Sequence, residues 1–369
     1  MKVVIALSDV SGGHMSAAKA IASSLQIVSP GVDVEIVDLM KQVGKFPFAD
    51  MEKSWKMVSN SQIAESFSNL AYRLLGTKIG HDLSSQIINW RIGKDALSKL
   101  NEYKPDIVVS THFVVSAFLE SAKYHGAKFK TMSVAADLVG FPRLLADRNA
   151  DLVFAPTKAA AERFTRFGLP KENVAYPFFP LDPKLMNARL GGSLLAELNL
   201  NPNVPTVLVT GGGLGTVTLL EGVDELLDID IQIIILAGKS MEFQEKLRQR
   251  YKSRSQVCIL GFVDNMQDYV SAVDLVISKP GPATIVELEA LKKKALFTRP
   301  VGAQELGNVP YLMQNPNFRY IGDDYETICR QVQELLENGT ADFAPRFATD
   351  AGLQLAARIL EVGGRDRLR

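Results

Sequence analysis

Two glycine-rich segments follow predicted strands and precede predicted helices, where each could bind an anion. Residues 8–14 have the sequence SDVSGGH, and residues 210–215 have the sequence TGGGLG. Glycines let backbone amides approach a phosphate, and the start of a helix adds a partial positive charge. Neither segment has the G-x-G-x-x-G spacing of dinucleotide-binding proteins. The two segments therefore favour a phosphate or another polar headgroup over a nicotinamide cofactor, unless both are only tight turns.

One histidine ends the first of these turns, and another follows a different predicted strand. His14 stands at the start of a predicted helix, where the positive helix end favours the neutral imidazole that can accept a proton. A capping role without proton transfer is the alternative for His14. His112 follows another predicted strand, in the sequence VSTH of residues 109–112, so it could face the same cleft.

The most informative stretch is residues 278–287, with the sequence SKPGPATIVE. Pro282 suits the first turn of a helix, where its missing N–H is not needed. The amides of Ala283 and Thr284 would then be free to face a diphosphate. Glu287 lies one turn later on the same helix face, where a carboxylate can accept both hydroxyls of a ribose. This combination predicts a site for a nucleotide-sugar, with a solvated Glu287 as the alternative.

Two further segments follow predicted strands in the C-terminal half. Residues 302–308, GAQELGN, contain Gln304 and Glu305, whose donors and acceptors could recognise sugar hydroxyls. Residues 261–265, GFVDN, could pair with the edge of a pyrimidine through their backbone.

The amino-acid composition restricts the classes of protein to which this chain can belong. The 369 residues are 47% hydrophobic and 22% charged, which is typical of globular proteins and excludes disordered ones. The 41 basic residues balance 41 acidic ones, so we expect no nucleic-acid partner. Cys258 and Cys329 lack the spacing of metal ligands or a disulfide framework, which fits a reducing cytoplasm. No apolar stretch approaches the roughly 18 residues that span a bilayer, so any membrane contact would be peripheral.

Runs rich in Val, Ile and Leu alternate with longer amphipathic stretches, a pattern typical of parallel strands joined by helices. The pattern occurs twice and predicts strands at 2–7, 34–38, 107–110, 131–135 and 152–155, and then at 206–209, 232–237, 257–260, 275–278 and 295–298. Each half is therefore expected to form a doubly wound α/β sheet that binds ligands at the carboxyl ends of its strands. The proline-rich residues 176–183 predict a boundary between domains 1–176 and 177–349.

Taken in order, the motifs resemble those of one enzyme family. They are Gly12-Gly13-His14, Asp137, Gly261-Phe262-Val263, Lys279-x-Gly281-x-x-Thr284-x-x-Glu287 and Gln304-Glu305-x-Gly307-Asn308. They are similar to the monogalactosyldiacylglycerol synthase and processive diacylglycerol glucosyltransferase group, within the GT-B glycosyltransferases of family 28. The resemblance implies two Rossmann-like domains facing a central cleft. It also implies inverting transfer of a hexose from a UDP-sugar to a lipid hydroxyl of the diacylglycerol type, with no metal and no other cofactor.

The resemblance further implies roles for individual residues. Val263 would contact uracil, Glu287 the ribose, residues 281–284 the diphosphate, and Gln304 with Glu305 the sugar. The full donor set is Gly212, Gly213, Leu214, Phe262, Val263, Lys279, Gly281, Pro282, Ala283, Thr284, Glu287, Gln304, Glu305 and Asn308.

On the acceptor side, His14 or Asp137 would be the catalytic base, beside the predicted acceptor-binding residues Ser11, Gly12, Gly13 and His112. The departures from the family pattern, such as Ser11 in place of a glycine, all fall on this side. They leave the identity of the acceptor and the choice of base open. The stretch 350–362 would be the helix that crosses back to the N-terminal domain.

Membrane contact is expected through the N-terminal domain at the cytoplasmic face. Residues 41–57 interleave aromatic and basic side chains that could lie in a membrane interface, among them Phe46, Phe48, Lys53, Trp55 and Lys56. Packing on the domain's own core is the alternative. Residues 1–176 carry 21 basic and 17 acidic residues, a net charge of +4. Residues 177–369 carry 20 basic and 24 acidic residues, a net charge of −4. The basic half would therefore dock on an anionic membrane.

Two other functions are compatible with the same motifs. One is a UDP-N-acetylglucosamine 2-epimerase, which acts on the sugar without an acceptor. The other is a catalytically inactive protein that binds a UDP-sugar, which the altered acceptor-side residues would suit.

Overall fold

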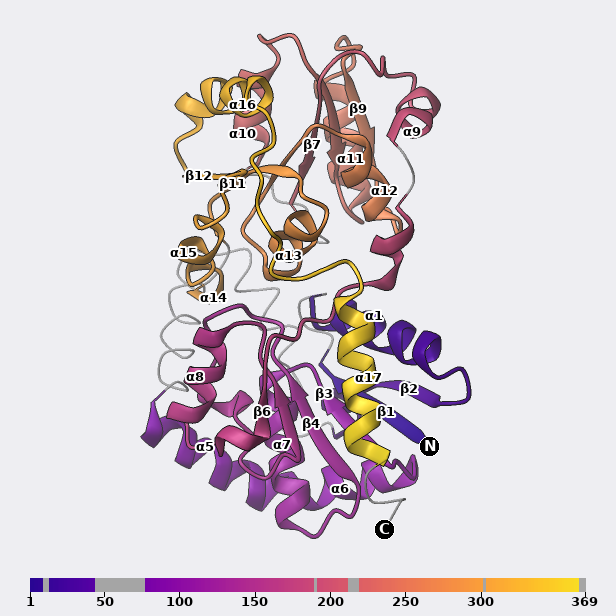
Figure 1. Cartoon of the computed structure of the whole chain (residues 1–369), viewed down its shortest axis with the longest axis vertical. Helices are drawn as coiled ribbons and strands as arrows, with labels where there is room; N and C mark the ends of the chain where they lie inside the picture. Colours follow the sequence, from indigo (N-terminus) through magenta and orange to yellow (C-terminus); the bar gives the residue numbers. More distant parts are fainter. Residues whose placement is uncertain (9–12, 44–76, 189–190, 212–218, 301–302, 365–369) are drawn as a thin grey trace. The chain divides into compact units, whose positions relative to one another are not determined.

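The structure is a computed structural model, which describes residues 1–8, 13–43, 77–188, 191–211, 219–300 and 303–364 (Figure 1). The chain divides into two compact units. Unit 1 comprises Met1–Pro183, Gly302–Gln304 and Asp350–Arg369, and unit 2 comprises Lys184–Val301 and Glu305–Thr349. The chain first leaves unit 1 at Pro183, the last residue of the proline-rich segment.

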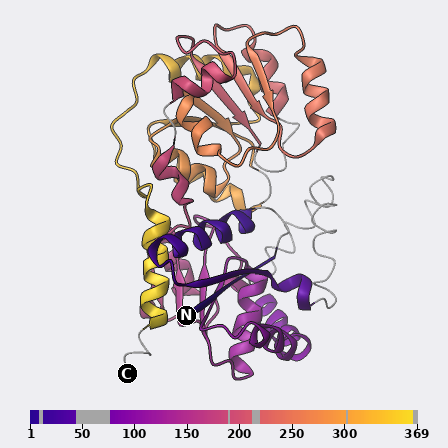
Figure 2. The same ribbon diagram turned by 90° about the vertical axis from the view of Figure 1, so that its right-hand side faces the viewer.

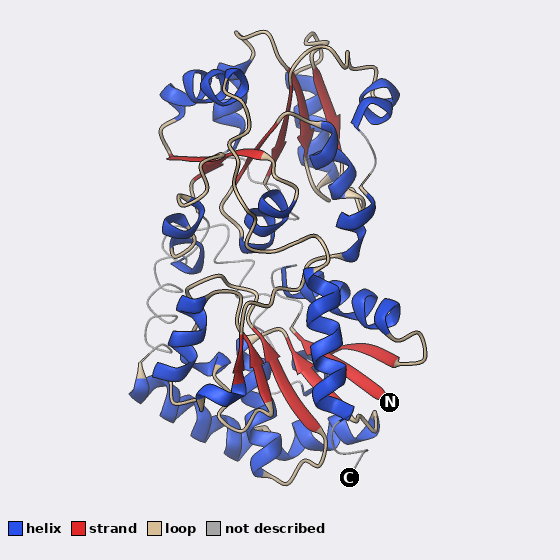
Figure 3. Ribbon diagram, in the orientation of Figure 1, coloured by secondary structure: helices blue, strands red, loops and turns tan. Residues whose placement is uncertain are grey.

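Unit 1 is built on a parallel sheet of six strands in the order β2-β1-β3-β4-β5-β6 (Figure 3). In chain order these are β1 (Lys2–Leu7), β2 (Asp33–Asp38), β3 (Ile107–Ser110), β4 (Lys130–Val134), β5 (Leu152–Phe154) and β6 (Val174–Ala175). Val3 pairs with Val34 of β2 on one side and with Ile107 of β3 on the other. Helices cover both faces, so the central strands are apolar throughout and not alternating.

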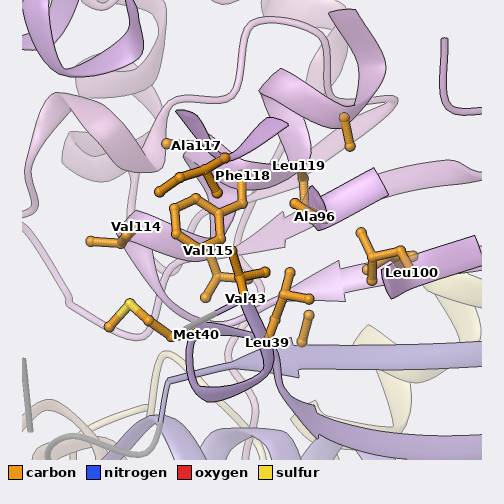
Figure 4. Packing of buried hydrophobic residues seen from close by; sticks show 14 of the residues in the cluster. Leu39, Met40, Val43, Ala96, Leu100, Val114, Val115, Ala117, Phe118 and Leu119 are labelled. Carbon is orange, nitrogen blue, oxygen red and sulfur yellow. The ribbon is translucent and has the colours of Figure 1, made fainter. Parts of the chain in front are cut away.

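The helices of unit 1 form two layers on the sheet. They are α1 (Gly13–Val28), α2 (Leu39–Val43), α5 (Lys78–Arg91), α6 (Gly93–Glu102), α7 (Phe113–Tyr124), α8 (Lys158–Arg166) and α17 (Ala351–Gly364), with 3₁₀ turns at Arg143–Leu145 and Lys171–Asn173. Figure 4 shows the core under α2, α6 and α7, which centres on the fully buried ring of Phe118. A second core lies under α1 and α17 and includes Ile21, Leu355 and Ile359.

Helix α17, near the end of the chain, packs beside α1 within unit 1 (Figure 2). The contact is close at Gly352, where an added Cβ would lie 2.1 Å from the Leu181 carbonyl oxygen and 2.8 Å from Ser24 Oγ. Only a glycine fits this position without moving the backbone, which fixes the place of α17 on α1.

Unit 2 repeats the plan with six parallel strands in the order β12-β11-β10-β7-β8-β9. The strands are β7 (Thr206–Thr210), β8 (Gln232–Leu236), β9 (Val257–Leu260), β10 (Leu275–Ser278), β11 (Lys294–Thr298) and β12 (Phe318–Gly322). The helices are α9 (Gly191–Glu197), α10 (Leu219–Leu226), α11 (Met241–Arg250), α12 (Met266–Ala272), α13 (Pro282–Ala290), α15 (Val309–Leu312) and α16 (Ile328–Glu337), with a 3₁₀ turn at Tyr325–Thr327. Helix α14 (Ala303–Leu306) and the 3₁₀ turn at Pro183–Asn187 each begin in unit 1 and end in unit 2.

The predicted fold class, two doubly wound parallel sheets, is confirmed, and each of the ten predicted strands is present to within one residue at either end. The prediction missed β6 and β12, which are the last strands at one edge of each sheet. β6 has only two residues, and β12 contains Arg319 among its apolar residues. An edge strand is covered less completely than a central one, so its sequence carries a weaker apolar signal.

Gly352→Ala tests the packing of α17 against Leu181 and against Ser24 of α1. We expect the variant to lose roughly 1–3 kcal/mol of unfolding free energy, because the new methyl group collides with the backbone carbonyl of Leu181. The control is Gly364→Ala at the end of the same helix, where nothing lies within 4 Å of an added Cβ. Urea unfolding measures both; equal stability of the two variants would contradict the packing described.

Candidate functional site

The order of strands in unit 1 reverses between β1 and β3, which lie side by side. The helix after β1 leaves on one face of the sheet and the helix after β3 on the other, so both helices start at the carboxyl ends of these neighbouring strands. His14, in the first turn of α1, and His112, directly before α7, both lie there. The topology thus brings together two residues that are 98 positions apart in the chain.

Backbone contacts determine which ring nitrogen of His14 carries the proton. Its Nδ1 lies 2.6 Å from the carbonyl oxygen of Thr111, which can only accept a hydrogen bond. Nδ1 is therefore the donor, and Nε2 of the neutral ring holds a lone pair. Burial lowers the pKa of His14 below its usual value, and the contact with Thr111 opposes this in part. The ring is consequently suited to accept a proton at Nε2.

His112 has the opposite tautomer. Its Nδ1 accepts the N–H of Val114 at 3.2 Å, which caps α7, so the proton of the neutral ring is on Nε2. Burial, and then the neighbouring His14, hold the pKa of His112 well below the usual histidine value. The two rings meet edge to face with their centroids 4.6 Å apart. Two neutral rings can share this space, whereas two imidazolium ions would repel each other.

A chain of buried hydroxyls, which the sequence analysis missed, fixes the backbone at His112. Ser133 Oγ donates to Ser116 Oγ, which donates to Ser110 Oγ, each at 3.0 Å. Ser110 Oγ in turn donates to the carbonyl of His112 at 3.0 Å and accepts its N–H at 3.2 Å. Serines on separate strands and a helix give no joint signal in a sequence, because only the folded sheet brings them together.

The other predicted residues of the acceptor side lie nearby or outside the description. Asp137 follows β4, the neighbour of β3, and its side chain is half-buried. Thr157 steadies this loop by donating to the carbonyl of Leu138 at 2.7 Å while it caps α8. Gly13 is the exposed first residue of α1, whereas Ser11 and Gly12 lie outside the described residues.

Unit 2 has its own reversal of strand order, between β7 and β10. The turn after β10 leads through Gly281, whose backbone is the N-cap of α13, to Pro282 in the first helical turn. Ala283 and Thr284 lie in the first turn, where backbone amides have no partner within the helix, and the N-cap residue makes no side-chain hydrogen bond to them. Glu287 lies one turn further along with its side chain half-buried.

Three polar side chains surround this turn. Lys279 forms an ion pair with Glu305, whose side chain is only 8% exposed. Asn308 is fully buried, and its amide donates to the carbonyl of Pro280 at 3.0 Å. Asn308 therefore braces the turn that α13 follows, while its side-chain oxygen accepts no hydrogen bond from the described residues.

The loops after β8 and β9 form the neighbouring part of this edge. Phe262 is 55% exposed, and Lys239 Nζ lies 4.8 Å from the centre of its ring. Buried Gln244 donates to the carbonyl of Gly238 at 2.9 Å, and its amide would be 3.0 Å from a Cβ at Gly261. The sequence analysis predicted Phe262 and Val263, which is half-buried, as site residues. It missed Lys239 and Gln244, because a lysine in a loop and a glutamine on a helix are common and do not by themselves indicate a site.

The remaining predicted residues are not placed by the structure. Outside the described residues lie Gly212, Gly213, Leu214, Phe46, Phe48, Lys53, Trp55 and Lys56, and the side chain of Gln304 is likewise not described. Within the described ranges, no three His, Cys, Asp or Glu side chains are grouped so that they could hold a metal ion. None of the described helices combines the length and the apolar character needed to cross a membrane.

Comparison with protein families gives a match in each unit. Residues 14–178 match the family described as monogalactosyldiacylglycerol (MGDG) synthase, and residues 206–342 match the glycosyltransferase family 28 C-terminal domain. The chain is 27% identical over 372 residues to a probable monogalactosyldiacylglycerol synthase 2 of Oryza sativa subsp. indica. That alignment covers 96% of this chain and 77% of the relative.

Solved structures with the same fold have much lower sequence identity. A UDP-GlcNAc 2-epimerase from Neisseria meningitidis bound to UDP-GlcNAc matches with a TM-score of 0.63 at 14% identity, covering 98% of this chain and all of the other. MurG of Acinetobacter baumannii matches with a TM-score of 0.57 at 16% identity, covering 98% and 94%. At these identities the likeness establishes the fold alone.

The histidine pair predicts a pH dependence of stability. Above the unfolded pKa of about 6.5, both rings are neutral whether the chain is folded or not. Below it, the unfolded chain takes up protons that the folded one excludes, so stability falls by up to roughly 1 kcal/mol per pH unit for each ring. His112→Asn keeps an acceptor for the α7 cap and removes one ring. Urea unfolding between about pH 7 and pH 5 should show a smaller loss for this variant; an identical loss would contradict the burial of a neutral His112.

Proposed function

Because the chain belongs to glycosyltransferase family 28, in the monogalactosyldiacylglycerol synthase group, we propose that it transfers a hexose from a UDP-sugar to a lipid hydroxyl of the diacylglycerol type. The observation that carries the proposal is that the two family matches lie in order along the chain, one in each unit. The match in unit 2 contains both strands at which its sheet reverses its order, β7 and β10, whereas the match in unit 1 begins after β1 and contains β3.

The donor would bind to unit 2. The amides at the start of α13 and the ammonium of Lys279 would face the diphosphate, and the half-buried carboxylate of Glu287 the ribose hydroxyls. The exposed ring of Phe262 and the backbone at Val263 would contact the uracil. Gln304 and Glu305 would hydrogen-bond the sugar. The positive charge for the departing diphosphate then comes from the protein, so we propose that no metal or other cofactor is required.

The acceptor would react in unit 1. His14 Nε2 would take the proton of the lipid hydroxyl while the hydroxyl oxygen forms a bond to the anomeric carbon, and the bond from that carbon to the UDP oxygen would break. UDP leaves with the bonding electrons, and the anomeric configuration inverts. The fixed tautomer of His14 favours it as the base over Asp137, because its basic nitrogen is the one that is not held by the backbone.

The protein would lie peripherally at the cytoplasmic membrane face, and one exposed side of α5 supports contact with a membrane. Leu83, Ile87 and Trp90 recur every third or fourth residue, so they share one side of the helix, and they are 57%, 46% and 82% exposed. The guanidinium of Arg91 lies 5.6 Å from the centre of the Trp90 ring. Exposed apolar side chains beside a cation are typical of helices that lie in a lipid interface. This face would add to the predicted contact of residues 41–57.

Transfer can be measured with purified protein, UDP-hexoses and diacylglycerol vesicles in the presence of EDTA. We expect a monohexosyl lipid by mass spectrometry, and we expect His14→Gln to lower kcat by about 10²–10⁴-fold while UDP binding is kept, because the variant loses only proton transfer.

The other outcomes of this experiment would contradict the proposal or identify one of the two alternative functions. No transfer from any UDP-hexose, or strict dependence on Mg²⁺, would contradict the proposal. Interconversion of free UDP-N-acetylglucosamine without lipid would identify an epimerase. Binding of a UDP-sugar with no turnover would indicate the inactive binding protein.

Membrane contact can be measured by flotation with vesicles that contain anionic lipid. Trp90→Ala should reduce the bound fraction, because the indole is the largest exposed apolar group on α5, and added salt should reduce it further. Met241→Ala, which removes an apolar side chain that is 71% exposed on unit 2, serves as the control. Binding that ignores Trp90, salt and anionic lipid would exclude this surface.

A further inference from the structure

The ion pair between Lys279 and Glu305 lies in the proposed donor site. The lysine side chain is 25% exposed and the glutamate side chain 8%, so the pair is largely withdrawn from water. Lys279 directly follows β10, and Glu305 lies in α14, after β11. Two loops from neighbouring strands thus place opposite charges together at the edge of the sheet where ligands bind.

The pair lies against the turn that begins α13. A Cβ added at Gly281 would be 3.3 Å from Lys279 Nζ, 3.8 Å from Glu305 Oε1 and 3.8 Å from Thr284 Oγ1. The ammonium is therefore beside the helix start that would receive a diphosphate. An anion that binds there competes with Glu305 for the same cation.

We propose that donor binding exchanges the partner of Lys279. The diphosphate takes the ammonium from Glu305, and the released carboxylate then accepts hydrogen bonds from hydroxyls of the sugar. This inference rests on the proposed function, because it requires a UDP-sugar in unit 2. No covalent bond changes in the exchange.

The low exposure of Glu305 makes the exchange selective. A carboxylate that loses its cation inside a protein loses part of the compensation for its desolvation, and new hydrogen-bond donors can restore that part. A UDP-sugar supplies both parts, the anion for Lys279 and the hydroxyls for Glu305. UDP alone supplies the anion for Lys279 but no sugar hydroxyls for Glu305. Glu305 therefore competes with UDP for Lys279 and weakens UDP binding. After transfer, the same competition promotes release of UDP.

The proposed exchange predicts whether one substitution raises or lowers the affinity for UDP. Glu305→Gln removes the competitor and keeps the shape, so UDP should bind about three- to tenfold more tightly than to the unmodified protein. If Glu305 only contacted the sugar, UDP affinity would not change. If the pair only held the fold together, UDP affinity would fall.

Isothermal titration of UDP into the full chain tests this with four proteins: unmodified, Glu305→Gln, Lys279→Gln and the double variant. We expect tighter binding for Glu305→Gln, weaker binding for Lys279→Gln, and no gain from Glu305→Gln when Lys279 is already replaced. The control is Glu242→Gln, which breaks an exposed ion pair with Lys246 on α11 and should leave UDP affinity unchanged. Titration of UDP-hexoses into Glu305→Gln should also show a smaller difference between UDP-hexose and UDP.

Unchanged or weaker UDP binding by Glu305→Gln, or a gain that persists without Lys279, would overturn the exchange. Failure of the unmodified protein to bind UDP would instead contradict the proposed function, and the exchange with it. Should Glu305→Gln fail to fold, Glu305→Asp shortens the side chain and weakens the same pair, so UDP affinity should again rise.

Discussion

The geometry of the parallel sheet is the constraint on which the rest of this protein depends. Every strand of such a sheet ends at the same edge, and helices leave from there to either face. Where the strand order reverses, neighbouring connections diverge, and the backbone amides of helix starts are left facing a crevice. Both units obey this rule, at β1 and β3 in unit 1 and at β7 and β10 in unit 2. Among the described residues, His14, His112, Lys279 and Gly281 lie in the connections that follow these strands.

The two edges differ in their electrostatics, which suits the two halves of a transfer reaction. In unit 1, burial keeps two histidines neutral, and backbone hydrogen bonds fix complementary tautomers on His14 and His112. In unit 2, a lysine and a glutamate are held as ions beside uncapped helical amides. The first arrangement can move a proton, and the second can receive a diphosphate and a sugar.

Much of the fold could be predicted from the sequence, because buried parallel strands are runs of Val, Ile and Leu that few other elements share. The motif around Gly281 was equally visible, since a glycine and a proline at fixed positions specify the start of a helix. The edge strands β6 and β12 were not predicted, because β6 is short and β12 contains Arg319. The serine chain under His112 and the contact of Gln244 with Gly261 escaped for a different reason. They are made by residues whose types are ordinary and whose proximity exists only in the folded sheet.

The central claim is that the proposed transfer is a single displacement at the anomeric carbon. Because a UDP-hexose carries its sugar in the α configuration, a single displacement with a lipid hydroxyl as nucleophile must give a β-linked glycolipid. Proton NMR of the purified product measures this configuration directly. A β linkage is the result we predict, and an α linkage would contradict a mechanism in which His14 activates the hydroxyl for direct attack.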